Sequence, residues 1–281
     1  MKLKAYAKIN LSLDVIRKRE DSYHEIKTIM QKISLYDELE FNKIDKGFNF
    51  ICQDKSLLTE DNLIHKAHRT MEAYCKRSLP LEISLKKNIP IGAGLAGGSS
   101  DGAACMLALN ELYNLNLSME ELSEIGLGLG ADFPYMLRMG TYLATGIGEK
   151  LEKISDFSNF YILIINPGYE VSTKEVYSNL KLDDKRIDFD SIIKYLGNKD
   201  FSSLKNVFEN KMEKYVFEKN PDLKKLKDDL NKNGLSLMSG SGPTIFCIFD
   251  SEDKLDWAYE MYKDSYKYVY RAKTIGENYD E

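Results

Sequence analysis

The chain has 281 residues, of which 43% are apolar and 30% are charged, and its 39 basic and 44 acidic side chains leave a net charge of −5. At about 150 residues per domain, this length predicts two lobes or one large domain and excludes a small scaffold held by disulfides. The acidic balance argues against binding of nucleic acid or anionic membrane through the overall field, and no apolar run resembles a membrane span or signal peptide, so a cytoplasmic location is expected.

Residues 3–15 alternate strictly, with apolar side chains at the odd positions and polar or amphipathic ones at the even positions. This period of two predicts a half-buried strand with one wet face, as in an antiparallel sheet. Lys8, Asn10 and Ser12 then share the side where a ligand could bind. Taken alone, a plain solvated face is the simpler interpretation.

Further strands are predicted at 33–45, 48–53 and 81–87, with a helix between residues 61 and 77. His65 and His68 fall near the polar side of that helix. Their spacing suits two metal ligands, but no third ligand lies nearby, so both are expected to be solvated.

A glycine-rich stretch follows the 81–87 strand, with glycines at positions 92, 94, 97 and 98 just before an apolar helical run. Glycines allow close approach of the backbone, and the start of a helix offers unpaired N–H groups, so the pattern predicts a phosphate-binding loop. Ser99 and Ser100 can cap the helix or meet a phosphate-bound Mg²⁺.

Two familiar nucleotide loops fit less well. A Walker A loop needs a lysine before the helix, and none is present. Gly92–Gly97 does match G-x-G-x-x-G, which keeps a dinucleotide-binding enzyme as a rival. That fingerprint belongs after a buried parallel strand, however, whereas this loop follows an alternating one.

The loop resembles the second motif of the GHMP kinases, a family of small-molecule kinases. Three other segments are similar to motifs of the same family, in the same order: Ala7–Leu11, Gly130–Pro134 and Met238–Thr244. The resemblance implies an α+β, two-lobed fold. Its N-terminal lobe, 1–154, would have a mixed or antiparallel sheet and hold ATP, and a C-terminal α+β lobe, 155–281, would complete the substrate cleft.

Two segments, Asp21–His24 and Ser172–Tyr177, resemble those with which some members bind a cytidine-bearing alcohol. Tyr23 and Tyr177 can stack on the two faces of a cytosine, and His24 can hydrogen-bond its edge. Without the resemblance, the tyrosines would read as ordinary packing residues. The chain departs from the family pattern at Ser22, Ala96 and Ile147.

The resemblance also implies the roles of individual residues in an ATP- and Mg²⁺-dependent phosphorylation. Asp132 would accept the proton of the hydroxyl, with Lys8 beside it to help place the attacking oxygen. From the sequence alone, Asp132 before Pro134 also reads as a helix N-cap. The expected ATP-binding residues are Pro90, Ile91, Gly92, Ala93, Gly94, Leu95, Ala96, Gly97, Gly98, Ser99 and Ser100. The expected substrate-binding residues are Asn10, Tyr23, His24, Thr173, Tyr177, Gly240, Ser241 and Gly242.

The C-terminal half predicts strands at 160–165, 235–238, 244–249 and 267–273, with helices near 172–180, 201–217, 221–233 and 252–264. The helix around residue 225 has an apolar row at 223, 226 and 230, so its lysines should be solvated. The four cysteines, which form no C-x-x-C pair, are expected to be reduced. A nucleotide-sensing module without turnover remains an alternative to the enzyme, and neither nucleic acid nor membrane is an expected partner.

Overall fold

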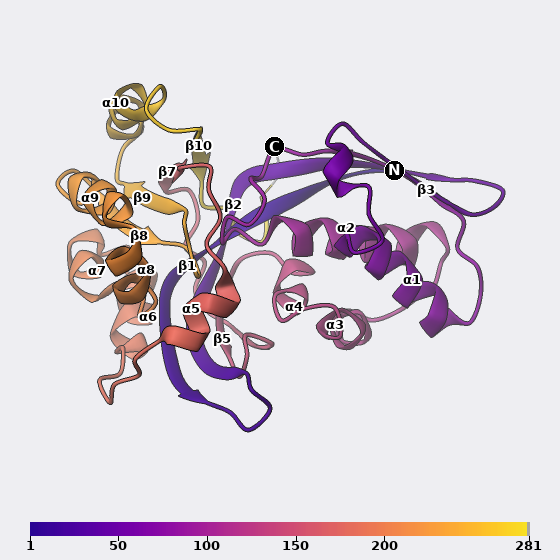
Figure 1. The fold of residues 1–281 in the computed structure, drawn as a ribbon, viewed down its shortest axis with the longest axis horizontal. Helices are drawn as coiled ribbons and strands as arrows, with labels where there is room; N and C mark the ends of the chain where they lie inside the picture. The colour runs from indigo at the N-terminus through magenta and orange to yellow at the C-terminus, as the bar shows by residue number, and fades with distance from the viewer. Residues whose placement is uncertain (280–281) are drawn as a thin grey trace. The chain divides into compact units, whose positions relative to one another are not determined.

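The computed structural model describes residues 1–279, which form two compact units built from interleaved segments (Figure 1). The first unit comprises residues 1–7, 36–89 and 96–138, and the second comprises 8–35, 90–95 and the described chain from 139 onward. Helices accompany two separate sheets, so the expected α+β class is confirmed. The division into lobes at 1–154 and 155–281 stays a prediction. Within residues 1–279, every helix is too short or too polar to cross a bilayer.

Strands β1 (Lys2–Lys18) and β2 (His24–Lys43) pair with each other and run through both units. The alternation of residues 3–15 is therefore correctly interpreted as a strand, whereas the strand expected at 33–45 begins earlier, at His24. In the second unit, β2 pairs antiparallel with β5 (Thr141–Thr145), and β5 pairs antiparallel with β6 (Lys150–Lys153).

The wet face expected for β1 is wrong. Lys8, Asn10 and Ser12 are each no more than 5% exposed. Other segments of the second unit cover this face: the Ser12 hydroxyl accepts a hydrogen bond from the Glu209 N–H at 3.1 Å, and the neighbouring Asp14 accepts one from the Ile187 N–H at 3.0 Å. A polar strand face is thus buried, with its polar groups hydrogen-bonded.

The first unit contains a mixed sheet and the helices around the glycine-rich loop. The second part of β2 pairs antiparallel with β4 (Leu81–Lys86), and β3 (Phe48–Cys52) lies parallel to β4. A short 3₁₀ turn, η1 (Lys55–Leu57), precedes α1 (Leu63–Cys75), which packs against α2 (Gly97–Leu112). Helices α3 (Met119–Leu127) and α4 (Phe133–Met136) complete the unit.

The solvated position expected for the two histidines of α1 is wrong for His68. Its side chain is buried, and its Nε2 lies 2.8 Å from the carbonyl oxygen of Leu79. His65 is half-buried and its ring packs edge-on against Phe48. The strand beside α1 covers a face that the helical spacing alone marks as polar.

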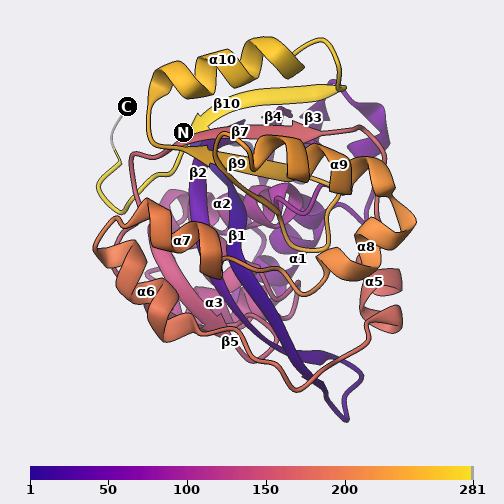
Figure 2. The same cartoon turned by 90° about the vertical axis from the view of Figure 1, so that its left-hand side faces the viewer.

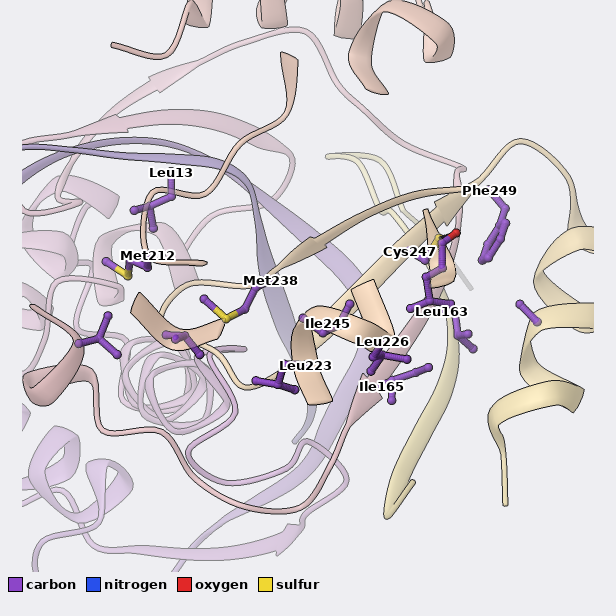
Figure 3. Close-up of a cluster of buried hydrophobic side chains, with 14 of the residues drawn as sticks. Leu13, Leu163, Ile165, Met212, Leu223, Leu226, Met238, Ile245, Cys247 and Phe249 are labelled. Carbon is purple, nitrogen blue, oxygen red and sulfur yellow. Dashed lines mark hydrogen bonds between the residues drawn. The ribbon is translucent and has the colours of Figure 1, made fainter. Parts of the chain in front are cut away.

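The second unit has a four-stranded antiparallel sheet in the order β10–β7–β9–β8. These strands are β7 (Tyr161–Asn166), β8 (Leu235–Met238), β9 (Ile245–Phe249) and β10 (Tyr268–Lys273). Helices α9 (Pro221–Leu230) and α10 (Glu252–Tyr262) lie along it (Figure 2). Leu223 and Leu226 enter the core beside Ile245, so the apolar row predicted on α9 is confirmed (Figure 3).

The single helix expected at 201–217 is wrong, because this stretch forms α7 (Phe201–Val207) and α8 (Glu213–Lys219). Between them, Asn210 forms an isolated bridge with Leu13 of β1, and its side-chain amide donates to the carbonyls of Met238 and Gly240, each at 2.8 Å. Between α7 and α8, these long-range hydrogen bonds take the place of the backbone hydrogen bonds that a continuous helix would form. Helices α5 (Thr173–Asn179) and α6 (Phe189–Gly197) precede α7.

Candidate active site

The glycine-rich loop connects β4 to α2, and its backbone adopts conformations that favour glycine. Gly92 and Gly94 have φ of 62° and 73°, and Ala96, the residue before α2, has φ of 55°. Within residues 1–279, no side chain caps the start of α2. Its first N–H groups and the positive end of its dipole are therefore available to an anion such as a phosphate.

The two serines at the start of α2 differ in their surroundings. Ser100 is buried, and its hydroxyl donates to the Tyr6 carbonyl at 2.8 Å. Ser99 is half-buried, and its hydroxyl makes no hydrogen bond to any of residues 1–279. Ser99 is therefore the serine whose oxygen can meet a phosphate-bound cation without giving up a bond.

Gly94 joins the loop to the third glycine motif. The Ser239 hydroxyl donates to the Gly94 carbonyl at 2.9 Å, and a side chain on Gly94 would overlap the Ser239 carbonyl oxygen. The Lys8 N–H in turn donates to the Leu95 carbonyl at 3.1 Å. Within the second unit, the first motif, the first half of the loop and the third motif are thus in direct contact.

A chain of hydrogen bonds orients the polar side chains of β1. The Thr28 hydroxyl donates its one proton to the Ser12 carbonyl at 2.6 Å, so it must accept the 2.9 Å bond from Asn10 Nδ2. This assigns the amide of Asn10, whose Oδ1 accepts from Lys8 Nζ at 2.7 Å. The ammonium of Lys8 is therefore held in one position by a buried network.

The third glycine motif lies beside the predicted substrate segment on α5. The hydroxyls of Thr173 and Ser241 are 2.7 Å apart and share a hydrogen bond. Gly240 and Gly242 have φ of 58° and 80°, values that favour glycine. Asn210 holds the motif through the Gly240 carbonyl. The structure thus brings Thr173 into contact with Ser241, another of the predicted substrate-binding residues.

Two residues of the predicted base site, His24 and Tyr177, lie together, in a contact that the sequence did not predict. The rings of His24 and Tyr177 are stacked, whereas Tyr23 is 60% exposed. Burial, together with the nearby charge of Lys18, lowers the pKa of His24, so its imidazole is mostly neutral at pH 7 and can both donate and accept. Ser22 keeps the turn with φ of 71°, in the conformation that glycine would adopt.

Asp132 lies in the first unit, together with residues Ala96–Ser100 of the loop. It occupies the N-cap position of α4, as the sequence predicted, but within residues 1–279 its carboxylate makes no capping hydrogen bond to that helix. The next residue, Phe133, is fully buried, and its side chain lies so close to Gly102 of α2 and Gly126 of α3 that a Cβ atom at either glycine would overlap it. This packing fixes the backbone that carries Asp132.

Three residues that organise this site are not predicted from the sequence: Thr28, Asn210 and Ser239. Each acts through a backbone carbonyl or side chain far away in the chain, so no local pattern marks Thr28 or Asn210. Ser239 alone had a signal, since it lies inside the glycine motif at 238–244.

A cavity of about 530 Å³ lies elsewhere in the second unit, between β1, residues 179–186, α8 and α9. Its walls carry both charges, including the buried pair of Glu213 and Lys227, whose charged atoms are 2.5 Å apart. It is lined by none of the residues predicted to bind ATP or substrate.

Comparison with known proteins places this geometry in a family. Residues 62–138 match the model of the GHMP kinases N terminal domain, and residues 188–267 match that of the GHMP kinases C terminal domain. A 4-diphosphocytidyl-2-C-methyl-D-erythritol kinase of Clostridium perfringens is 41% identical, covering 99% of both chains, and one of Thermoanaerobacter pseudethanolicus is 43% identical, covering 98% of this chain and 96% of that one.

Solved structures agree with these matches. A crystal structure of 4-(cytidine 5'-diphospho)-2C-methyl-D-erythritol kinase superimposes with a TM-score of 0.85 at 29% identity, covering 98% of this chain and all of the other. A mevalonate kinase structure superimposes with a TM-score of 0.72 at 17% identity over 99% of this chain and all of the other, which shows a shared fold.

Proposed function

The chain belongs to the GHMP kinases, and on this premise we propose that it transfers the γ-phosphoryl group of ATP to the 2-hydroxyl of 4-diphosphocytidyl-2-C-methyl-D-erythritol. This reaction is a step of non-mevalonate isoprenoid precursor synthesis. Relatives about 40% identical over nearly their whole length carry the name of that kinase. The cytoplasmic location expected from the sequence stays a prediction.

One observation carries the proposal: three segments far apart in the sequence converge in the second unit. The bonds from Lys8 to Leu95 and from Ser239 to Gly94 join the first motif, the glycine-rich loop and the third motif. A structural turn would not need this convergence of glycines at positive φ, whereas a loop that holds phosphates needs exposed backbone N–H groups.

The donor site is the loop and the start of α2. We assign ATP to Pro90–Ser100, with its phosphates near the uncapped N–H groups of α2. A Mg²⁺ ion bound to ATP would neutralise charge on the phosphates, and the Ser99 hydroxyl is the group that fits it best. The dinucleotide alternative is not supported, because β4, although parallel to β3, is antiparallel to β2 and only half-buried.

The acceptor site is formed by the aromatic and hydroxyl groups on β2, α5 and the third motif. His24 and Tyr177 would contact the cytosine, and Asn10, Thr173 and Ser241 would bind the rest of the substrate. Asp132 would take the proton of the 2-hydroxyl. The hydroxyl oxygen would then form a bond to the γ-phosphorus while the bond between the γ-phosphorus and the β,γ-bridging oxygen breaks. Lys8, held by Asn10, would place the attacking oxygen.

The test is ADP release on adding each of four alcohols: the cytidylated methylerythritol, mevalonate, homoserine and galactose. We expect kcat/KM for the cytidylated alcohol to exceed the others by at least about 100-fold, since a site built for a base leaves polar groups unpaired with substrates lacking one. Equal turnover of mevalonate or homoserine would be consistent with the family assignment but would contradict the proposed substrate. Binding of ATP without ADP release from any of the four would favour the nucleotide-sensing alternative.

A further inference from the structure

A buried ion cluster lies in the first unit, outside the residues assigned above. The ammonium of Lys87 is 2.5 Å from Asp37 Oδ2 and 2.7 Å from Asp101 Oδ2. The side chains of these residues are 13%, 0% and 4% exposed. Burying three charged groups costs desolvation free energy, which is offset only where the groups are well paired and hydrogen-bonded.

The two carboxylates hold different parts of the chain. Asp37 Oδ1 accepts hydrogen bonds from the N–H groups of Asn88 and Ile89, at 2.6 and 2.8 Å, and so fixes the backbone that leads into the glycine-rich loop. Asp101 lies in α2, just after the loop has ended. Lys87 therefore links the residues before the loop to the residues after it.

The same lysine supports the start of α2 directly. A Cβ atom on Gly97, the first residue of α2, would lie 3.0 Å from Lys87 Nζ and 2.9 Å from Ile89 Cγ2. Gly97 is therefore packed against the side chains that the cluster holds in place. A shift of Lys87 would be transmitted to the N–H groups that begin this helix.

Asp101 depends on Lys87. Its other oxygen, Oδ1, is buried and has no hydrogen-bond partner among residues 1–279. Burial raises the pKa of Asp101 well above its usual value, and the Lys87 ammonium opposes that rise. Burial also lowers the pKa of Lys87, but the two carboxylates outweigh it and raise the pKa above its usual value, so Lys87 stays charged.

We propose that Lys87 is a positioning residue for ATP binding. Its side chain holds the two ends of the glycine-rich loop and the start of α2 in the geometry that receives the phosphates. This rests on the proposed kinase function. The Lys87 ammonium already pairs with Asp37 and Asp101, so Lys87 acts through position rather than by attracting phosphate. A Walker A loop has its lysine inside the loop; here the lysine stands before the loop and braces it.

The chain offers a matched control one residue away. Lys86 pairs with Glu38 at 2.6 Å, but both side chains are about half or more exposed. Lys86→Met thus removes a neighbouring lysine at the end of β4, together with its ion pair to Glu38, and leaves the buried cluster unchanged. Glu38→Gln is the corresponding control for Asp101→Asn.

The experiment measures three quantities for each variant: affinity for a non-hydrolysable ATP analogue, affinity for the cytidylated alcohol without nucleotide, and the melting temperature. For Lys87→Met we expect at least a tenfold loss of analogue affinity, with the alcohol affinity within twofold of wild type. Lys86→Met should leave both within twofold. The analogue measurement needs no turnover, so it tests Lys87 even if the substrate proposed above is wrong.

Two results would overturn the proposal: a folded Lys87→Met protein that binds the analogue as wild type does, or one in which both affinities fall by the same factor. If Lys87→Met does not fold, Asp101→Asn decides, because it keeps an acceptor for Lys87 and removes only one charge. A threefold or greater loss of analogue affinity alone would support the proposal, and unchanged affinity would reject it.

Discussion

The imidazole of His24 stacks on the phenol ring of Tyr177, with ring centroids 5.0 Å apart and 24° between the ring planes. His24 begins β2 and Tyr177 lies on α5, so the contact joins segments that are 153 positions apart in the chain. One face of Tyr177 is therefore already covered. A cytosine that stacks on Tyr177 must use the opposite face or displace His24.

Replacing Tyr177 tests this arrangement. Tyr177→Ala should raise KM for the cytidylated alcohol about 5- to 150-fold, because one stacked base contributes about 1–3 kcal/mol, and it should leave ATP affinity nearly unchanged. Tyr177→Phe keeps the ring and should be near wild type, with Leu between Phe and Ala. Tyr74→Ala, on the half-exposed surface of α1, is the control. An Ala variant as active as Phe at subsaturating substrate would end the stacking hypothesis for this residue.

Asp132→Asn tests the general base. We expect kcat to fall about 10²- to 10⁴-fold while affinity for a non-hydrolysable ATP analogue is kept, because a positioned base contributes that much to proton transfer. The buried Phe133 should keep the local backbone in place. Asp45→Asn, at an exposed position in the turn after β2, is the control. A variant with more than about half of the wild-type kcat would mean that another group takes the proton.

Gly98→Val tests the donor site at a position where a side chain is tolerated by the fold. A Cβ on exposed Gly98 would meet Leu63 Cδ1 at 3.5 Å, an ordinary contact, whereas one on Gly94 would overlap backbone. The branched side chain should block the approach of phosphate to the start of α2, so ATP affinity should fall severely and affinity for the cytidylated alcohol should not.

The control for that variant is Gly197→Val at the end of α6, where the nearest atom to an added Cβ is also 3.5 Å away. Both variants should have similar melting temperatures. If titration shows ATP binding to Gly98→Val at wild-type strength, the loop does not hold the donor.

The lowered pKa of Lys32 predicts how the free energy of unfolding depends on pH. Burial lowers the pKa of this lysine on β2 to about 7, against about 10.4 in an unfolded chain. Between these values the unfolded chain binds more protons than the folded one, so the free energy of unfolding should rise as the pH increases from 7 to 10. Below about pH 7 the full cost of burying the charge remains.

Lys32→Met should remove this contribution. At pH 6 to 7 the variant should be more stable than wild type by up to about 5 kcal/mol, and the difference should shrink towards pH 10. Chemical denaturation across this range measures it, with exposed Lys46→Met as the control. A difference between Lys32→Met and wild type that does not change with pH would show that Lys32 carries no such shift.

The sequence by itself determined the features that local pattern encodes. The alternation of residues 3–15 predicted β1, the row at 223, 226 and 230 predicted the buried face of α9, and the spacing of glycines predicted the loop before α2. Helices α3 and α6 and strands β5 and β6 were not predicted, although the capping box of Ser118 and Glu121 marks the start of α3 in the sequence. The motifs also led to the family.

Only the tertiary structure decided which polar groups are buried and what each one touches. Lys8, Asn10 and His68 lie on faces that periodicity marks as wet, yet they are covered by segments distant in the chain. Asn210 lies between α7 and α8, where the sequence predicted a single helix, and its amide donates to the Gly240 carbonyl. Lys87 braces the loop through Asp37, 50 positions earlier. A local pattern records the polarity of one face; whether another segment covers that face depends on non-local packing, which no window of sequence contains.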